Sequence, residues 1–257
     1  MLDLLEKLDG KVELIQSNTD GYIFIPINGT TDEDIQAIMT EWETRTKLKL
    51  KKEIIYDIQQ RDVNNYMYRT EDGEIHTVGE ALKYYNHWQN SLDKDVFTCN
   101  EPPIFHHILV EYYMNHKMPE EVIKENMRNL RMFHYLCKKG SFDGLEYQRN
   151  YKDGTVETAR LQKVNRAFPM NDPDSTGMVY KYKKPVAGKR IKTMRAKVAN
   201  LPDSVFIYDK EILSDKAFNY LKEKIDWQYY VNRGYEKILT FARITQIKDF
   251  NIKEKIK

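Results

Sequence analysis

Two oxygen-bearing side chains, Asn18 and Asp20, stand at alternate positions near the start of the chain. They belong to the four-residue segment Asn-Thr-Asp-Gly, which joins two runs rich in β-branched and aromatic residues. A carboxylate held at the tip of a tight turn is a suitable ligand for a hard cation such as Mg²⁺, which prefers oxygen donors. A turn of the same composition with no metal function is the other interpretation of these four residues.

The flanking runs predict a β-hairpin over residues 12–26 that presents this turn. Asn and Asp-Gly suit a tight turn because they tolerate positive φ and Gly has no Cβ. Residues 2–9 carry Leu at helical spacing, and residues 32–46 combine an apolar stripe with a polar start at Thr31. We therefore expect one helix before the hairpin and one after it.

The remaining pattern predicts a mixture of strands and helices. It gives, in order, a strand over 48–58, a hairpin over 65–79 that turns at Asp72-Gly73, helices over 103–117 and 119–138, short strands and loops over 141–210, and a helix over 214–243. The fold class we expect is α+β. Antiparallel hairpins occupy residues 1–95, and a mostly helical region at 96–257 contains a basic strand-and-loop segment at 141–210.

Composition sets broad limits on the class of protein. The chain has 257 residues, 41% of them hydrophobic, a formal net charge of +2, and two cysteines without the spacing of a zinc site. No apolar run approaches the roughly 20 residues that a membrane span needs. We expect a cytoplasmic protein that has no disulfide framework and does not enter a membrane.

Positive charge is concentrated between residues 160 and 197. Eleven Lys and Arg residues stand there against only Asp172 and Asp174, a local balance of +9 in a chain whose total is +2. Such segregation favours binding to phosphates, because affinity for nucleic acid comes largely from counterion release. A solvated charged surface is the alternative. The residues that we expect to contact nucleic acid here are Arg166, Lys181, Lys183, Lys184, Lys189 and Arg190.

The segment around Asn18 and Asp20 resembles motif C of the family B DNA polymerases, in the Asn-Thr-Asp-Gly form of many phage-type members. The resemblance implies that Asp20 is the catalytic carboxylate that binds Mg²⁺, and that Asn18, at the position of the family's first Asp, is a neutral metal ligand. Tyr66 matches the Tyr of the family's Lys-x-Tyr hairpin, which implies that it contacts the primer end. Asn64 stands where the family has Lys.

Further segments resemble the thumb and C-terminal parts of phage-type members, so the resemblance runs in order over nearly the full chain. They are residues 119–138, 161–168, 177–183 and 226–230. The resemblance implies that residues 1–95 are the C-terminal part of a palm and that residues 96–257 are a thumb.

The implied activity is DNA-directed DNA polymerisation with Mg²⁺, primer–template DNA and dNTP, in the cytoplasm, or in the host cytoplasm if a phage encodes the chain. The family's motif A carboxylate, fingers Lys and exonuclease carboxylates cannot be placed in this sequence. We therefore expect a second polypeptide that carries the exonuclease, motif A and the fingers, and an isolated chain that is inactive. Two other functions remain open: a non-catalytic DNA-binding subunit or degenerate polymerase remnant, in which Asp20 is only a turn residue, and an RNA-binding protein.

Overall fold

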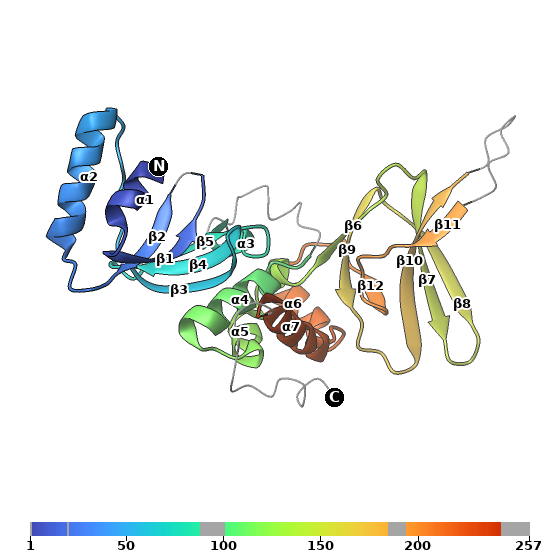
Figure 1. Ribbon diagram of the computed structural model, residues 1–257. Helices are drawn as coiled ribbons and strands as arrows, with labels where there is room; N and C mark the ends of the chain where they lie inside the picture. Colours follow the sequence, from blue (N-terminus) through green and yellow to red (C-terminus); the bar gives the residue numbers. More distant parts are fainter. Residues whose placement is uncertain (1, 20, 88–100, 185–193, 243–257) are drawn as a thin grey trace, which may run out of the picture. The chain divides into compact units, whose positions relative to one another are not determined.

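The computed structural model describes residues 2–19, 21–87, 101–184 and 194–242 (Figure 1). The chain divides into two compact units, Met1–His76 and Thr77–Lys257. The fold is α+β with antiparallel sheets, as the sequence predicts. The predicted boundary between residues 95 and 96 lies outside the described residues.

Residues 2–46 form the two helices and the hairpin that the sequence predicts. In chain order these elements are α1 (Leu2–Leu8), β1 (Val12–Ser17), β2 (Tyr22–Pro26) and α2 (Asp32–Thr46). The Thr31 hydroxyl accepts the Asp34 N–H, while the Asp34 carboxylate accepts the Thr31 N–H at 2.9 Å. This reciprocal cap satisfies two backbone donors that a helix leaves open, and so fixes the start of α2.

A small apolar core holds the hairpin in place. Leu4, Leu8 and Trp42 are buried together between α1 and α2, and Tyr22 and Phe24 of the hairpin pack against them. An isolated two-stranded hairpin is marginally stable in water. The burial of one of its faces on the two helices is therefore what makes the β1–β2 turn a defined structure.

A three-stranded antiparallel sheet follows, with β4 in its centre. Its strands are β3 (Ile55–Asp62), β4 (Asn65–Thr70) and β5 (Ile75–Val78). The predicted hairpin turn at Asp72-Gly73 is confirmed, and Gly73 supplies the positive φ of 84° that this turn requires.

The predicted strand over 48–58 is wrong in its first part, because residues 48–54 are irregular. Lys47 ends α2 in the left-handed conformation, and the Leu50 N–H then donates to the Glu43 carboxylate at 2.7 Å. Pairing with β4 begins only at Ile55, which lies opposite Thr70.

The second unit contains a helical part and a strand part (Figure 1). The helices are α3 (Tyr84–His87), α4 (Ile104–Asn115), α5 (Pro119–Asn126), α6 (Asp215–Leu221) and α7 (Trp227–Phe241). Phe105, Phe133 and Tyr230 are fully buried, and the Tyr230 ring contacts both phenylalanine rings, with 5.2 Å between its centroid and that of Phe133. The Tyr230 hydroxyl donates to the Phe133 carbonyl oxygen, which connects α7 to the chain just before the first strand of the unit.

Two helix predictions in this unit need correction. The helix expected over 119–138 ends at Asn126; residues Leu130–Met132 form one 3₁₀ turn and Tyr135–Lys138 form a strand. Alternate burial in this strand, with Tyr135 and Cys137 fully buried, fits the period of two that pairing with another strand imposes. The helix expected over 214–243 is two helices, because Asp226 starts α7 by accepting the Tyr229 N–H at 3.0 Å.

The expectation of a mostly helical region at 96–257 is also wrong, since the described residues of this region contain seven strands beside four α-helices. The strands are β6 (Tyr135–Lys138), β7 (Gly144–Tyr151), β8 (Val156–Leu161), β9 (Val164–Pro169), β10 (Ser175–Lys183), β11 (Met194–Lys197) and β12 (Val205–Ile207). They form two antiparallel sheets, a four-stranded sheet in the order β11-β10-β7-β8 and a three-stranded sheet in the order β12-β9-β6.

The two sheets meet where β10 passes β12 at Gly177. The Gly177 N–H donates to the Ser204 hydroxyl at 3.1 Å, and the Tyr147 hydroxyl donates to the Val205 carbonyl oxygen at 3.0 Å. A Cβ added at Gly177 would collide with that carbonyl oxygen and with the Tyr147 hydroxyl. Glycine is therefore required here for the close approach of two backbones rather than for an unusual φ.

We expect Gly177→Ala to lower the free energy of unfolding by about 3 kcal/mol, because the methyl group forces the sheets apart. Chemical denaturation of the full chain measures this change. Thr176→Ala, at the exposed neighbouring position, is the matched control and should change stability by well under 1 kcal/mol. Equal stability of the two variants would show that the sheets do not meet at Gly177.

Candidate nucleic-acid interface

The β1–β2 turn is closed by its own residues. The Asn18 N–H donates to the Gly21 carbonyl oxygen at 3.1 Å, and the Gly21 N–H donates to Asn18 Oδ1 at 2.8 Å. An amide oxygen has two lone pairs and carries no net charge, so this type of oxygen is a neutral ligand for a cation. Because the Asn18 amide is neutral, the negative charge that holds Mg²⁺ would have to come from Asp20 and from carboxylates outside this turn. Asp20 itself lies outside the described residues.

Tyr66 lies on β4 in a ladder of three half-buried rings. Its ring stacks on Tyr68 with 6.1 Å between centroids, and Tyr68 stacks on His76 with 5.2 Å. The Tyr68 hydroxyl donates to Glu53 at 3.1 Å, and burial together with this carboxylate raises the pKa of Tyr68 to about 12. Stacking on Tyr68 of the same strand fixes the direction of Tyr66, and cross-strand stacking on His76 fixes that of Tyr68. Glu53 and Glu74 make this face less favourable for phosphate than the basic surface of the second unit.

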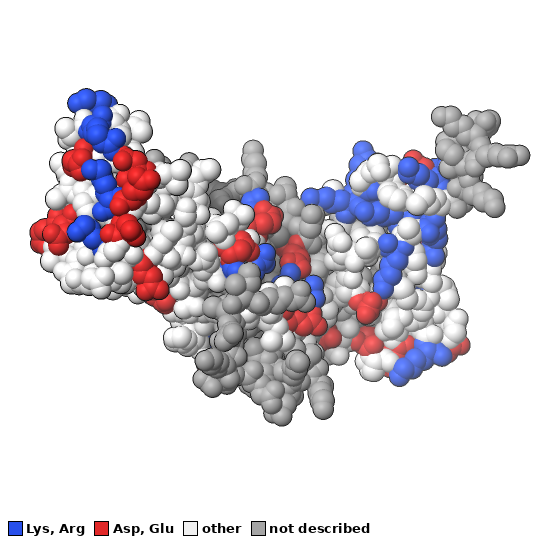
Figure 2. All heavy atoms as spheres, viewed as in Figure 1, with Lys and Arg blue, Asp and Glu red and all other residues white. Residues whose placement is uncertain are grey.

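Two connections that are distant in sequence, β6 to β7 and β8 to β9, converge with the end of β10 at one end of the strands in the second unit. The Lys139 N–H donates to the Lys163 carbonyl oxygen at 3.0 Å, and the Asp143 N–H donates to the Tyr182 carbonyl oxygen at 3.0 Å. We call this region the basic end; its cations are Lys138, Lys139, Lys163, Lys181, Lys183 and Lys184. Lys and Arg side chains gather over this part of the strands in Figure 2.

Most of the charge of the basic end is not neutralised. Lys163, Lys181, Lys183 and Lys184 form no ion pair with any residue that the structure describes. The ammonium groups of Lys181 and Lys183 lie 5.7 and 5.5 Å from the centroid of the Phe142 ring. The basic end is thus a surface where an anion would gain from several cations at once.

Other cations of the predicted basic stretch are already paired. Arg195 on β11 binds Glu146 at 2.7 Å, and Lys197 binds Asp203 at 3.2 Å. Because their charges are already neutralised, these two residues contribute less to an anion site than a simple count of Lys and Arg suggests.

The predicted contacts of the basic stretch divide into three groups. Lys181, Lys183 and Lys184 come together at the basic end. Arg166 lies on β9, where its N–H donates to the Asp209 carboxylate at 2.8 Å. Lys189 and Arg190 lie outside the described residues.

Sequence reasoning missed Lys139 and Phe142 at this surface. The sequence predicts one helix over residues 119–138, and this prediction gives no reason to expect a connection between two strands at residues 139–143. The alternate burial of Tyr135 and Cys137, which marks the strand that leads into this connection, is visible only in the structure.

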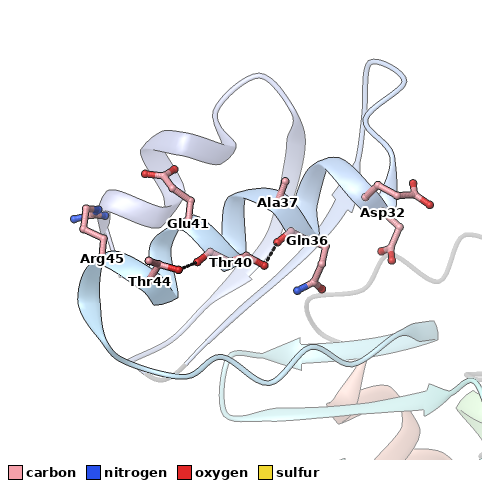
Figure 3. A pocket seen from close by; sticks show the side chains of 8 residues that line it. Asp32, Gln36, Ala37, Thr40, Glu41, Thr44 and Arg45 are labelled. Atoms are coloured by element: carbon pink, nitrogen blue, oxygen red, sulfur yellow. Dashed lines mark hydrogen bonds between the residues drawn. The ribbon is translucent and has the colours of Figure 1, made fainter.

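An open groove of about 780 Å³ lies along the outer face of α2 (Figure 3). The hydroxyls of Thr40 and Thr44 donate to the carbonyl oxygens of Gln36 and Thr40, and the rim charges Glu41 and Arg45 pair with α1. Its donors and charges are thus largely engaged within the unit, so the groove is a weaker candidate than the basic end.

No helix within the described ranges is long and apolar enough to cross a membrane. Neither a protein-family model nor a curated protein nor a solved structure matches this chain. The function must therefore be argued from the residues and from the geometry given above.

We expect the combined change Lys163→Gln, Lys181→Gln and Lys183→Gln to weaken binding to duplex DNA. Three fewer cations should also reduce the slope of log affinity against log salt by roughly 2–3. Titrations of labelled DNA at several salt concentrations measure both quantities. Gln at three exposed lysines of the helical part, Lys124, Lys216 and Lys222, is the charge-matched control. An equal loss in both triple variants would contradict a local phosphate site.

A buried histidine, His134, lies near Arg166 at the start of β6. His134 is 2% exposed, its Nδ1 has no hydrogen-bond partner among the described residues, and burial together with the nearby Arg166 and Arg131 charges lowers its pKa to about 4. The neutral ring is therefore favoured in the folded chain, whereas an unfolded histidine titrates near pH 6.5.

Between about pH 6.5 and pH 4 the unfolded chain therefore binds a proton at His134 that the folded chain does not. The free energy of unfolding consequently keeps its full value above about pH 6.5 and falls as the pH is lowered towards 4. We expect the free energy of unfolding to drop by up to roughly 3 kcal/mol more in the native chain than in His134→Gln over this range. Denaturation curves of the two proteins between pH 7 and pH 4 measure the difference, in which the shared carboxylates cancel. Parallel pH profiles would show that His134 titrates normally.

Proposed function

We propose that this chain is the C-terminal portion of a template-directed DNA polymerase, which contributes a Mg²⁺-binding carboxylate and a surface that binds DNA. The observation that carries the proposal is the β1–β2 hairpin, with its Asn18-to-Gly21 turn at the tip and one face packed on α1 and α2. A turn on such a support can keep a metal ligand in one place. The sequence of this turn, Asn-Thr-Asp-Gly, is the form that resembles motif C.

Each part of the chain has a distinct role in this proposal. Asp20 and Asn18 are the proposed metal ligands, and bound Mg²⁺ would stabilise the negative charge that develops when the primer 3′ oxygen displaces pyrophosphate. Tyr66, oriented by Tyr68, contacts the primer strand. The basic end binds the phosphates of the duplex without reading its sequence, because lysines at phosphates carry no base information.

The proposal also requires a second polypeptide. A two-metal site needs at least two carboxylates, and the resemblance assigns one of them to motif A. The partner would therefore supply motif A, the fingers and the exonuclease, and would bind dNTP together with this chain.

A second candidate is a DNA-binding subunit with no catalytic role. It is favoured by the hydrogen bond from the Gly21 N–H to Asn18 Oδ1, which closes the turn without a cation. In that case Asp20 has the role of an ordinary turn residue, and the basic end alone performs the function.

Primer extension by this chain and its partner separates the two candidates. We expect Asp20→Asn to reduce the rate about 10³-fold or more, because Asn keeps the shape of the turn but removes the charge that holds Mg²⁺. Thr19→Ala, in the same turn, should retain most of the activity. The isolated chain should show no extension.

Two results would count against the catalytic proposal. Full activity of Asp20→Asn in the complex would favour the non-catalytic candidate. Robust synthesis by the isolated chain would show that the active site needs no second polypeptide.

A further inference from the structure

The Phe142 ring has an unusual place for an apolar side chain. It lies in the connection between β6 and β7, half-buried, within 6 Å of two ammonium groups. A third lysine, Lys139, donates to the Phe142 carbonyl oxygen at 3.0 Å and accepts the Phe142 N–H through its own carbonyl oxygen at 3.2 Å. The connection is thus tied down by its own hydrogen bonds, and the ring is presented in a fixed position among cations.

The opposite end of the four-stranded sheet offers a second cation beside an aromatic ring, with which the Phe142 site can be compared. There Arg149 lies 4.9 Å from the centroid of the Tyr151 ring, again a cation beside a half-buried aromatic residue. Arg149 is neutralised by Asp172 at 2.6 Å, and the Tyr151 hydroxyl donates to Glu157 at 2.9 Å. At that end, the charge of the arginine and the hydroxyl of the tyrosine are therefore both satisfied by carboxylates of the chain itself.

The Phe142 end lacks this neutralisation. Lys181 and Lys183 form no ion pair with a described carboxylate, and the nearby Asp143 accepts the Lys184 N–H at 2.6 Å through its carboxylate. Val164, the neighbour of Lys163, adds an apolar side chain that is 51% exposed. Cations and apolar surface are thus available on the same small area.

A ligand that suits this area carries negative charge and a flat apolar face. Phosphates can form ion pairs with the lysines, and a nucleobase can stack on the aromatic ring. Because a paired base inside a duplex has both faces covered by its neighbours, stacking on Phe142 requires an unpaired base. Phosphate contacts alone would not need an aromatic ring at this position.

We propose that the basic end binds single-stranded DNA, with one unpaired base stacked on Phe142 and the adjoining phosphates held by Lys139, Lys181 and Lys183. The site rests on the proposed function in that it adds to duplex binding a contact for the unpaired part of a primer–template. Phe142 sets the preference for unpaired strands, while the lysines set the overall affinity and its salt dependence.

The test compares a labelled oligo(dT) with a blunt duplex of the same length, both titrated with the full chain. We expect Phe142→Leu, which keeps apolar volume but loses the aromatic face, to weaken oligo(dT) binding about tenfold or more and to leave duplex binding within about twofold. Phe142→Trp should retain oligo(dT) binding, and its added fluorescence should be quenched by the bound base. Tyr151→Leu, at the neutralised end of the sheet, is the matched control and should change neither affinity.

The possible outcomes separate this inference from the proposed function. If Phe142→Leu weakens both ligands equally, or weakens neither, the stacking site is wrong while duplex binding by the native chain still supports the proposed function. If the native chain binds neither ligand, the stacking site and the DNA-binding part of the proposed function are both wrong. Loss of oligo(dT) affinity alone, with quenching in Phe142→Trp, supports the stacking site.

Discussion

The antiparallel pairing of β7 with β10 is the constraint on which the basic end depends. In this register Lys181 lies opposite Leu145 and Tyr182 lies opposite Gly144, so the start of β7 meets the end of β10 beside the 139–143 connection. A shift of one residue would move Lys181 and Lys183 to the other face of the sheet. The same register puts Gly177 under Val205, where a side chain cannot fit. One close backbone contact thus fixes the positions of lysines that lie at the far end of the strand.

A concentration of lysines such as the basic end opposes folding, because like charges repel one another. The second unit offsets this cost with buried apolar contacts that continue from its helices to its strands. Phe133 and Tyr230 join α7 to the chain before β6, and Ala167 and Phe168 continue the core into β9. The lysines therefore project from elements whose other faces are packed, which holds them at fixed spacing. Such an arrangement lowers the entropy that is lost when an anion binds.

The sequence predicted the boundaries of helices and turns correctly where contacts between residues close in sequence determine them. The cap at Thr31 and the Asp72-Gly73 turn gave the right boundaries, because each is decided by hydrogen bonds or φ angles within a few residues. The prediction of a helix failed at residues 135–138, where pairing with β9 overrides the helical pattern of the sequence. The gathering of Lys139 with Lys181 depends on contacts between segments about forty residues apart, which composition does not contain. Charge counting therefore found the basic stretch at 160–197, whereas the place of Phe142 beside its lysines is visible only in the structure.

The two proposed ligands of the chain, a cation and a DNA strand, place different demands on the protein. Metal binding at the β1–β2 turn depends on one carboxylate, so a single substitution can abolish it. Strand binding at the basic end is shared among several lysines, and each contributes a small, salt-dependent part of the affinity. Phe142 differs from the lysines, because stacking responds to whether a base is paired and is screened little by salt. The basic end can therefore combine sequence-independent affinity with discrimination between paired and unpaired strands, and this discrimination should persist at salt concentrations that weaken the lysine contacts.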